Sequence, residues 1–314
     1  MDKTYKKRIL FVGMPDMAIV CLHKLVEKGI NIVGVVPPSS DDSTYKLMVD
    51  TAQKLGPEII SYNFSLNEKG FLQRIKNLKA DLGVVASYGK KFPKEFLQLT
   101  KDGFINLHPS KLPDYRGGNP YSHIIMNGEE ESAITLHFMD ENFDTGDIIS
   151  QYKFSVDLNE TMGTLFTRTN EMCAAMLYEA LDYYETHSFP RRPQPKEGDF
   201  KTAEALSFEK GNTFIDWSKS AEEIERFIRA LNPFIGAITY YKGVVLRINS
   251  AYVIEKQHKL KAGEICDINN SLKVACGKDI LEIDSIQFGP YFISSGRDFV
   301  DRVNVRTGEV LSNE

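Results

Sequence analysis

The sequence predicts an α/β protein, with a Rossmann-like parallel sheet first and a small β-rich, OB-like domain after it. Three observations predict this. Short apolar runs alternate with helical segments up to about residue 187, as in a parallel sheet with helices on both faces. A Pro-rich, charged stretch over residues 189–211 interrupts them, and short alternating strands follow. We therefore expect an N-terminal domain over 1–190, a linker over 191–212 and a C-terminal domain over 213–314.

The expected elements follow from local patterns of apolar residues. Residues 8–13 read Arg-Ile-Leu-Phe-Val-Gly, a short apolar run ending in glycine that is typical of a buried parallel strand. Similar runs predict strands over 31–36, 81–86, 103–107 and 133–139. Helical spacing predicts helices over 16–28, 71–78, 162–187 and 221–231. Because ligands gather at the carboxyl ends of strands in such a sheet, we look for functional residues just after these strands.

Composition indicates an ordinary globular protein. The 314 residues are 42% hydrophobic and 26% charged, and a net charge of −5 does not favour a general nucleic-acid or acidic-membrane binder. The N-terminal apolar run is too short for a signal peptide or a membrane span. Neither the cysteines nor the histidines are spaced as metal ligands, so we expect no metal site. We expect free thiols in a reducing cytoplasm at Cys21, Cys173, Cys266 and Cys276.

The most informative stretch runs from residue 105 to residue 148. Asn106 and His108 lie two positions apart at the end of an expected strand, so their side chains share one face. Asp144 opens a D-T-G-D turn after the next expected strand. An amide can donate to a developing oxyanion, an imidazole can move a proton, and a carboxylate can orient and charge the imidazole. Each residue alone fits a capping or turn role, but the combination predicts transfer of an acyl group to a nucleophile.

A dinucleotide site is disfavoured after the first strand. The turn reads G-M-P-D-M-A, which lacks the G-x-G-x-x-G spacing. The second strand runs into Pro37 and Pro38 without the acidic residue that binds a ribose. We therefore do not expect a nicotinamide-dependent dehydrogenase.

The segments NLHPSKLPDYRGGNP and NGEEESAITLHFMDENFDTGDI resemble the signature of the folate-dependent formyltransferases. That family includes methionyl-tRNA formyltransferases, amino-sugar N-formyltransferases, glycinamide ribonucleotide formyltransferases and formyl-folate hydrolases and dehydrogenases. Its pattern N-x-H, S-x-L-P, R-G and L-D-T-G-D is met between Asn106 and Asp147, with Phe143 at the Leu position. The resemblance extends upstream over residues 9–36. Downstream, residues 215–237 resemble the start of the C-terminal domain of the first two groups, so nearly the whole chain is covered.

The resemblance implies transfer of a formyl group from 10-formyltetrahydrofolate to a primary amine. Asn106 and a protonated His108 would hold the oxyanion, each contributing ~3–4 kcal/mol. Asp144 would raise the pKa of His108 and relay a proton from the amine to N10 of the folate. Asp144 as the relay and His108 as the direct base are both compatible with the sequence.

Binding residues are also implied by position in the family pattern. The folate would contact Lys90, Lys91, Phe92, Ser110, Leu112, Pro113, Asp140, Glu141, Asn142 and Phe143. The acceptor amine would approach Met14, Arg116, Gly118 and Asn119. Gly118 and Asn119 stand where the family commonly has two alanines, and Lys111 stands where it usually has leucine. The first departure lies on the acceptor side, so it concerns which amine is formylated and not the chemistry.

Charge favours a small acceptor over tRNA. Residues 37–50 carry one lysine against three aspartates, whereas tRNA formyltransferases have a longer, basic insertion there. From Lys201 to the end, 15 basic residues face 16 acidic ones. Lys256, Lys259 and Lys261 are the candidates for tRNA phosphates, but a solvated hairpin is the favoured interpretation.

We therefore expect a nucleotide-linked amino sugar as acceptor, with the initiator aminoacyl-tRNA as the alternative. A formyl-folate hydrolase and a non-catalytic binder remain as further readings of the same fold. Trp217 is interpreted as a packing anchor, with stacking on a nucleotide base as the sharper alternative. The oligomeric state is not predicted.

Overall fold

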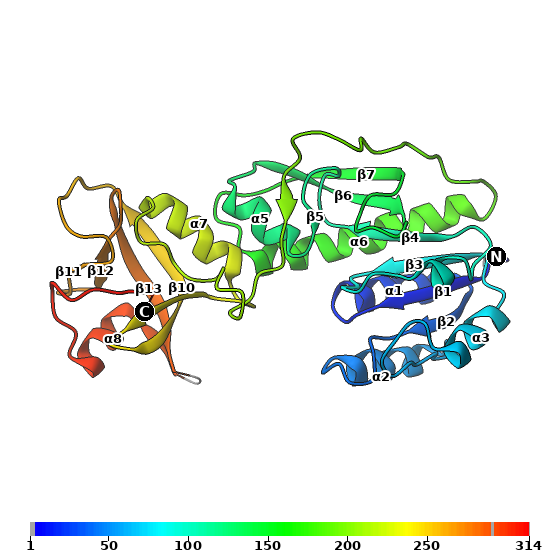
Figure 1. The fold of residues 1–314 in the computed structure, drawn as a ribbon, viewed down its shortest axis with the longest axis horizontal. Coiled ribbons are helices and arrows are strands. Elements are labelled where there is room, and N and C mark those ends of the chain that lie inside the picture. Colours follow the sequence, from blue (N-terminus) through cyan, green and yellow to red (C-terminus); the bar gives the residue numbers. More distant parts are fainter. Residues whose placement is uncertain (1–3, 290–291, 314) are drawn as a thin grey trace. The chain divides into compact units, whose positions relative to one another are not determined.

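The computed structural model describes residues 4–289 and 292–313 (Figure 1). The chain divides into two compact units. The first unit comprises Met1–Gly118, Glu131–Phe154 and Thr167–Ala203, and the second comprises Asn119–Glu130, Ser155–Phe166 and Glu204–Glu314. Each unit has its own core, so each is described by itself.

The first unit is built on a six-stranded sheet of order β2-β1-β3-β4-β6-β7. The strands are β1 (Ile9–Gly13), β2 (Ile32–Val36), β3 (Leu82–Ala86), β4 (Phe104–His108), β6 (Glu131–Phe138) and β7 (Ile148–Ser155). The pairs β1–β2, β1–β3 and β3–β4 are parallel. This confirms the predicted α/β class with a parallel-rich sheet. Strand β7 was not predicted, because only Ile148, Ile149 and Phe154 of its residues are buried and its outer half has no continuous apolar run.

Strand β6 runs antiparallel to β4, which the sequence did not indicate. Thr135 lies beside His108, and Phe138 lies beside Ile105 at the opposite end of β4. The chain therefore leaves β6 at the end that lies away from His108, so it cannot bring Asp144 near His108 directly. Residues 139–147 fold back instead, with the Phe138 N–H donating to the Asp147 carbonyl at 2.8 Å. The convergence expected from two parallel strand ends is thus achieved by a returning loop.

Helices in or reaching into the first unit are α1 (Met17–Glu27), α2 (Tyr45–Leu55), α3 (Lys69–Asn77), α4 (Lys94–Leu97) and α6 (Met162–Tyr184). Under the sheet, a buried aromatic cluster joins Phe71 and Phe96, whose stacked rings are 5.9 Å apart, with Phe92 and Phe104. Such a core fixes strand β4, and with it the position of Asn106. No helix in the described part of the chain is long and apolar enough to cross a membrane.

Residues 191–203, which we call the strap, belong to the first unit although their composition is that of a linker. Strand β8 (Thr202–Ala203) pairs in parallel with β5 (Arg116–Gly117). Arg192 exchanges backbone hydrogen bonds with Ile148 at 2.8 and 3.0 Å. The Tyr115 N–H also donates to the Lys201 carbonyl at 2.6 Å. Backbone groups make these contacts, so the side-chain pattern carried no sign of them.

The second unit is β-rich, as predicted. Its sheet has the order β11-β12-β13-β10-β9, and β14 pairs with β13. Trp217 is 5% exposed in its core and donates from Nε1 to Thr239 Oγ1 at 3.1 Å, which agrees with a packing anchor. The elements are α5 (Pro120–Met126), α7 (Ala221–Leu231), β9 (Ala237–Tyr241), β10 (Val244–Ile254), β11 (Ile265–Asp267), β12 (Leu272–Ala275), β13 (Ile280–Phe288), β14 (Phe292–Ser295) and α8 (Gly296–Val303).

A substitution at Gly83 in β3 tests how tightly this strand packs against Phe104 in β4. A Cβ at this position would lie 2.1 Å from the ring of Phe104, which is 1% exposed. We expect Gly83→Ala to lower the free energy of unfolding by about 1–3 kcal/mol, because the ring must move within a filled core. Gly70→Ala in α3 is the matched control: its Cβ meets no atom within 4 Å, and it should be neutral or stabilising by up to about 1 kcal/mol. Urea unfolding followed by far-UV circular dichroism measures both, and equal midpoints would contradict the packing argument.

Candidate functional site

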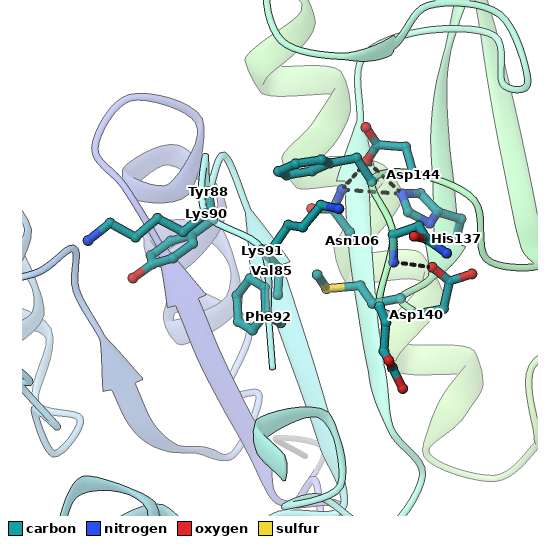
Figure 2. Close-up of a pocket in the computed structure, with 13 residues that line it drawn as sticks. Val85, Tyr88, Lys90, Lys91, Phe92, Asn106, His137, Asp140 and Asp144 are labelled. Atoms are coloured by element: carbon teal, nitrogen blue, oxygen red, sulfur yellow. Dashed lines mark hydrogen bonds and ion pairs between the residues drawn. The ribbon is translucent and has the colours of Figure 1, made fainter. Parts of the chain in front are cut away.

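Asn106, His137 and Asp144 converge from β4, β6 and the loop of residues 139–147 (Figure 2). Asn106 Nδ2 lies 3.2 Å from His137 Nε2 and 3.4 Å from Asp144 Oδ1. His137 Nδ1 donates to the Phe138 carbonyl at 2.7 Å, and His137 Nε2 lies 3.5 Å from Asp144 Oδ1. The amide nitrogen, and not its oxygen, therefore faces the carboxylate.

His108 lies behind this group and is 5% exposed. Its Nε2 donates to the Tyr115 carbonyl at 2.8 Å, which leaves Nδ1 facing Asp144 Oδ2 at 3.5 Å. Burial lowers the pKa of His108, and this outweighs the opposing effects of Asp144 and the Tyr115 carbonyl. Asp144 thus acts on the pKa of His108 in the expected direction, and burial of the imidazole opposes it.

Asp144 is held as an anion although its side chain is only 10% exposed. Burial opposes ionisation, but His108, His137 and the Gly117 N–H together lower the pKa of Asp144 to about 2. The Gly117 N–H donates to Asp144 Oδ2 at 3.0 Å. The backbone of Asp144 has a φ of +56°. The carboxylate is thus fixed from several sides, and the lowered pKa favours its charged form.

A pocket opens beside these groups, and seven of the ten residues predicted to bind folate line it (Figure 2). Its wall combines apolar side chains with the Asn106 amide and the Asp144 carboxylate. The lining consists of Val85, Tyr88, Lys90, Lys91, Phe92, Asn106, His137, Met139, Asp140, Glu141, Asn142, Phe143 and Asp144. The Lys91 ammonium lies 5.3 Å from the centre of the Phe143 ring, at the rim.

The S-x-L-P residues do not line this pocket. Ser110 is fully buried and donates to the Asp114 carbonyl at 2.7 Å, and Leu112 is 3% exposed. Thr135 Oγ1 donates to the Ser110 carbonyl at 2.6 Å, which ties this turn to β6. Ser110 and Leu112 thus face inward and shape the segment that ends at Tyr115, and the contact of Ser110, Leu112 and Pro113 with the folate stays a prediction.

The four residues predicted on the acceptor side do not line the pocket either. Met14 follows β1 and is half-buried, and Arg116 is bonded to Gln194 Oε1 at 2.7 Å. Gly118 is exposed. Asn119, in the second unit, has a φ of +53°, and its Oδ1 accepts a hydrogen bond from the Leu206 N–H at 3.0 Å. The departure from the family pattern at this position thus has a structural explanation within the second unit.

Two residues of this site were missed or underestimated from the sequence. His137 lies among buried residues of β6 and was not predicted as a site residue. Gln194 lies in the segment expected to be a linker, yet it is 8% exposed and donates to the Asp144 carbonyl at 2.9 Å. The first had a signal, a polar residue amid a buried strand next to the expected site. The second had none.

Comparison with known proteins supports both halves of the chain. The formyl transferase model matches residues 7–181, and the model of the formyl transferase C-terminal domain matches residues 208–304. The methionyl-tRNA formyltransferase of Clostridioides difficile (strain 630) is 34% identical over 310 residues, covering 97% of this chain and 99% of that protein. The methionyl-tRNA formyltransferase of Alkaliphilus oremlandii (strain OhILAs) is 34% identical over 312 residues, with the same coverage.

Solved structures share the fold at low sequence identity. The N-formyltransferase from Helicobacter canadensis, solved with folinic acid and dTDP-3-aminofucose, has a TM-score of 0.67 at 19% identity, covering 88% of this chain and 99% of that one. HypX from Aquifex aeolicus in complex with tetrahydrofolic acid has a TM-score of 0.62 at 18% identity, covering 96% of this chain and 48% of that one.

These findings overturn the predicted amino-sugar acceptor. Relatives that share 32–34% identity with this chain over nearly its whole length are named methionyl-tRNA formyltransferase, whereas the sugar-modifying structures share only the fold. The prediction was wrong because it used charges summed over a domain, and phosphate contacts depend on where charges lie. The predicted enzyme class, a folate-dependent N-formyltransferase using formyltetrahydrofolate, is confirmed. The chain belongs to the formyl transferase family.

Proposed function

We propose that this enzyme formylates the amino group of methionyl initiator tRNA, with 10-formyltetrahydrofolate as donor. The observation that carries the proposal is similarity across both units to proteins of that name, over 97% of this chain and 99% of theirs for Clostridioides difficile. A protein that shared only the catalytic fold would match over the first unit alone. The match to the C-terminal domain model over residues 208–304 agrees with a similarity that extends over both units.

The pocket fits a folate in chemistry. Val85, Phe92 and Met139 offer apolar surface to a flat ring system, and backbone groups of residues 140–143 lie beside them. The free volume is only about 30 Å³, so the rim must open for a ring to enter. Phe143 is 44% exposed at this rim, and its ring centre lies 5.3 Å from the Lys91 ammonium. The lysines at the rim suit the carboxylates of a folate tail.

The proposed chemistry assigns the proton to Asp144. Asp144 and Asn106 line the pocket, whereas His108 does not. We infer that the Asp144 carboxylate takes the proton of the attacking amine and returns it to the leaving nitrogen as the carbon–nitrogen bond breaks. Asn106 Nδ2 donates to the formyl oxygen as negative charge builds on it. His108 Nδ1, 3.5 Å behind the carboxylate, serves as a second acceptor that shares the proton.

Candidate contacts for the tRNA lie in the second unit. Lys256, Lys259 and Lys261 are all exposed within the segment that joins β10 to β11. Three cations within six residues form a local positive site even though the unit as a whole is nearly neutral. Phosphate contacts of this kind are independent of base sequence and weaken with salt.

The acceptor is tested directly. Purified enzyme, labelled formyltetrahydrofolate and charged initiator tRNA should give labelled formyl-methionyl-tRNA. A panel of nucleotide-linked 3- and 4-amino sugars should remain unlabelled above the no-acceptor rate. Labelling of the sugars with no labelling of the tRNA would sink the proposal, and donor consumption without any amine would indicate a hydrolase.

The assigned groups are tested by substitution. We expect His108→Ala and Asp144→Ala each to reduce transfer at least ~100-fold, because Asp144 takes the proton of the amine and His108 shares that proton from behind the carboxylate. Binding of 5-formyltetrahydrofolate, measured by calorimetry, should survive in both. Lys153→Ala on the exposed part of β7 is the control and should retain wild-type turnover. Near-normal transfer by either site variant would disprove the mechanism.

The protonation of His108 gives a test that needs no substrate. The folded-state pKa of His108 lies below the ordinary value of about 6.5. The imidazole should therefore be mostly neutral at pH 6.5. The stability that the neutral form contributes is present above that pH and is lost as pH falls through the lowered pKa. Asp144→Asn removes the charge that raises this pKa and should lower it further. Long-range ¹H–¹⁵N spectra over a pH series measure both, with Glu131→Gln, an exposed carboxylate paired with Lys153, as control. An upward shift in Asp144→Asn would contradict the electrostatic account.

A further inference from the structure

Both the nitrogen and the oxygen of the Gln194 side-chain amide form hydrogen bonds with the two segments that hold Asp144. Its Nε2 donates to the Asp144 carbonyl at 2.9 Å and to the Gly146 carbonyl at 2.7 Å. Its Oε1 accepts from Arg116 Nη2 at 2.7 Å and from Arg116 Nε at 3.3 Å. An amide offers two donor hydrogens and two acceptor lone pairs, so every hydrogen-bonding position is filled.

The two carbonyls belong to the returning loop, whose conformation needs support. Asp144 adopts a φ of +56°, a left-handed conformation that a non-glycine residue adopts at a cost. Gly146 lies so close to the Phe138 carbonyl that a Cβ would be 1.9 Å from the oxygen. Gln194 binds the backbone on both sides of this turn. It therefore fixes the point from which the Asp144 carboxylate projects.

The other end of the Gln194 amide acts on the opposite wall of the site. Arg116 directly precedes Gly117, whose N–H donates to Asp144 Oδ2 at 3.0 Å. One side chain thus links the backbone that carries the carboxylate to the backbone that hydrogen-bonds it. Gln194 does not line the folate pocket, so it reaches the chemistry only through these contacts.

We propose that Gln194 is a positioning residue, which holds the Asp144 carboxylate between Asn106, His108 and the Gly117 N–H. The inference rests on the proposed role of Asp144 in formyl transfer. It gives the strap a task in catalysis that its linker-like composition does not indicate.

The rest of the strap allows the side chain to be changed without releasing the segment. Pairing of β8 with β5 and the Ile148–Arg192 hydrogen bonds hold it by backbone groups on either side of Gln194. Gln194→Met keeps the length and removes every hydrogen bond. Gln194→Glu keeps one oxygen for Arg116 but replaces the donor nitrogen with a second oxygen, which faces the two carbonyls. Lys196→Met, an exposed position two residues away, is the matched control.

We expect Gln194→Met to reduce kcat for transfer to methionyl-tRNA by about 10- to 100-fold, because small displacements of a reacting group cost this much. The KM for the folate should stay within about twofold, because the pocket lining is intact. Gln194→Glu should lose a similar factor, since it also lacks the donors to the loop. Lys196→Met should match the wild type.

A double-mutant cycle separates positioning from general structural support. If Gln194 acts through Asp144, then adding Gln194→Met to Asp144→Asn should cost less than threefold, because there is no catalytic carboxylate left to misplace. An equal loss in both backgrounds would mean a structural role, and a kcat within twofold of the wild type in both Gln194 variants would also overturn the inference.

A readout without substrate keeps this test apart from the assignment of the acceptor. Asp144 and His137 are the titratable groups that act on His108, and only Asp144 raises its pKa. Gln194→Met should therefore lower the pKa of His108 measured by NMR, and Lys196→Met should not. An unchanged value in Gln194→Met would sink the positioning role even if the wild type proved inactive on tRNA. Inactivity of the wild type alone would instead remove the proposed acceptor.

Discussion

A buried carboxylate that must stay charged is the constraint on which the site depends. Desolvation of an unpaired anion is costly, so the protein surrounds Asp144 with groups that favour its ionised form. The Gly117 N–H, the Asn106 amide and the two histidines come from three different segments, and each is placed by backbone contacts of its own. Sheet order, the returning loop and the strap all serve to bring those segments within hydrogen-bonding distance of one carboxylate.

Many strands of the first unit could be predicted from the sequence, because a buried parallel strand is a continuous run of apolar residues. Strands β1 to β4 lie within one residue of the predicted ranges. The helix α2 was missed, since its segment was treated only as a charged loop, and the direction of β6 was missed because an apolar run does not encode which way a strand points. Pairing direction is decided by the connection and by what the strand packs against, and neither has a period in the sequence.

The site was predicted in part. Asn106, His108 and Asp144 were found through spacing and family resemblance, since chemistry restricts which residue types can do this work. The effect of burial on the pKa of His108 was not foreseen, because burial is a tertiary property. Gln194 was beyond reach for another reason: glutamine in a polar, Pro-rich segment is ordinary, and only the fold shows that its amide meets two carbonyls and a guanidinium.

The strap also bears on how this segment tolerates change in evolution. Its backbone is anchored at Arg192 and again at Thr202–Ala203, with Gln194 held between these points. The exposed side chains between these anchors contribute little to stability. Substitutions there should therefore change the stability little, which is compatible with a composition like that of a flexible connector. Insertions and deletions are different, because one residue more or fewer between the anchors would move the amide by about 3 Å along an extended chain. We therefore expect the strap to tolerate substitutions at its exposed positions better than changes in its length.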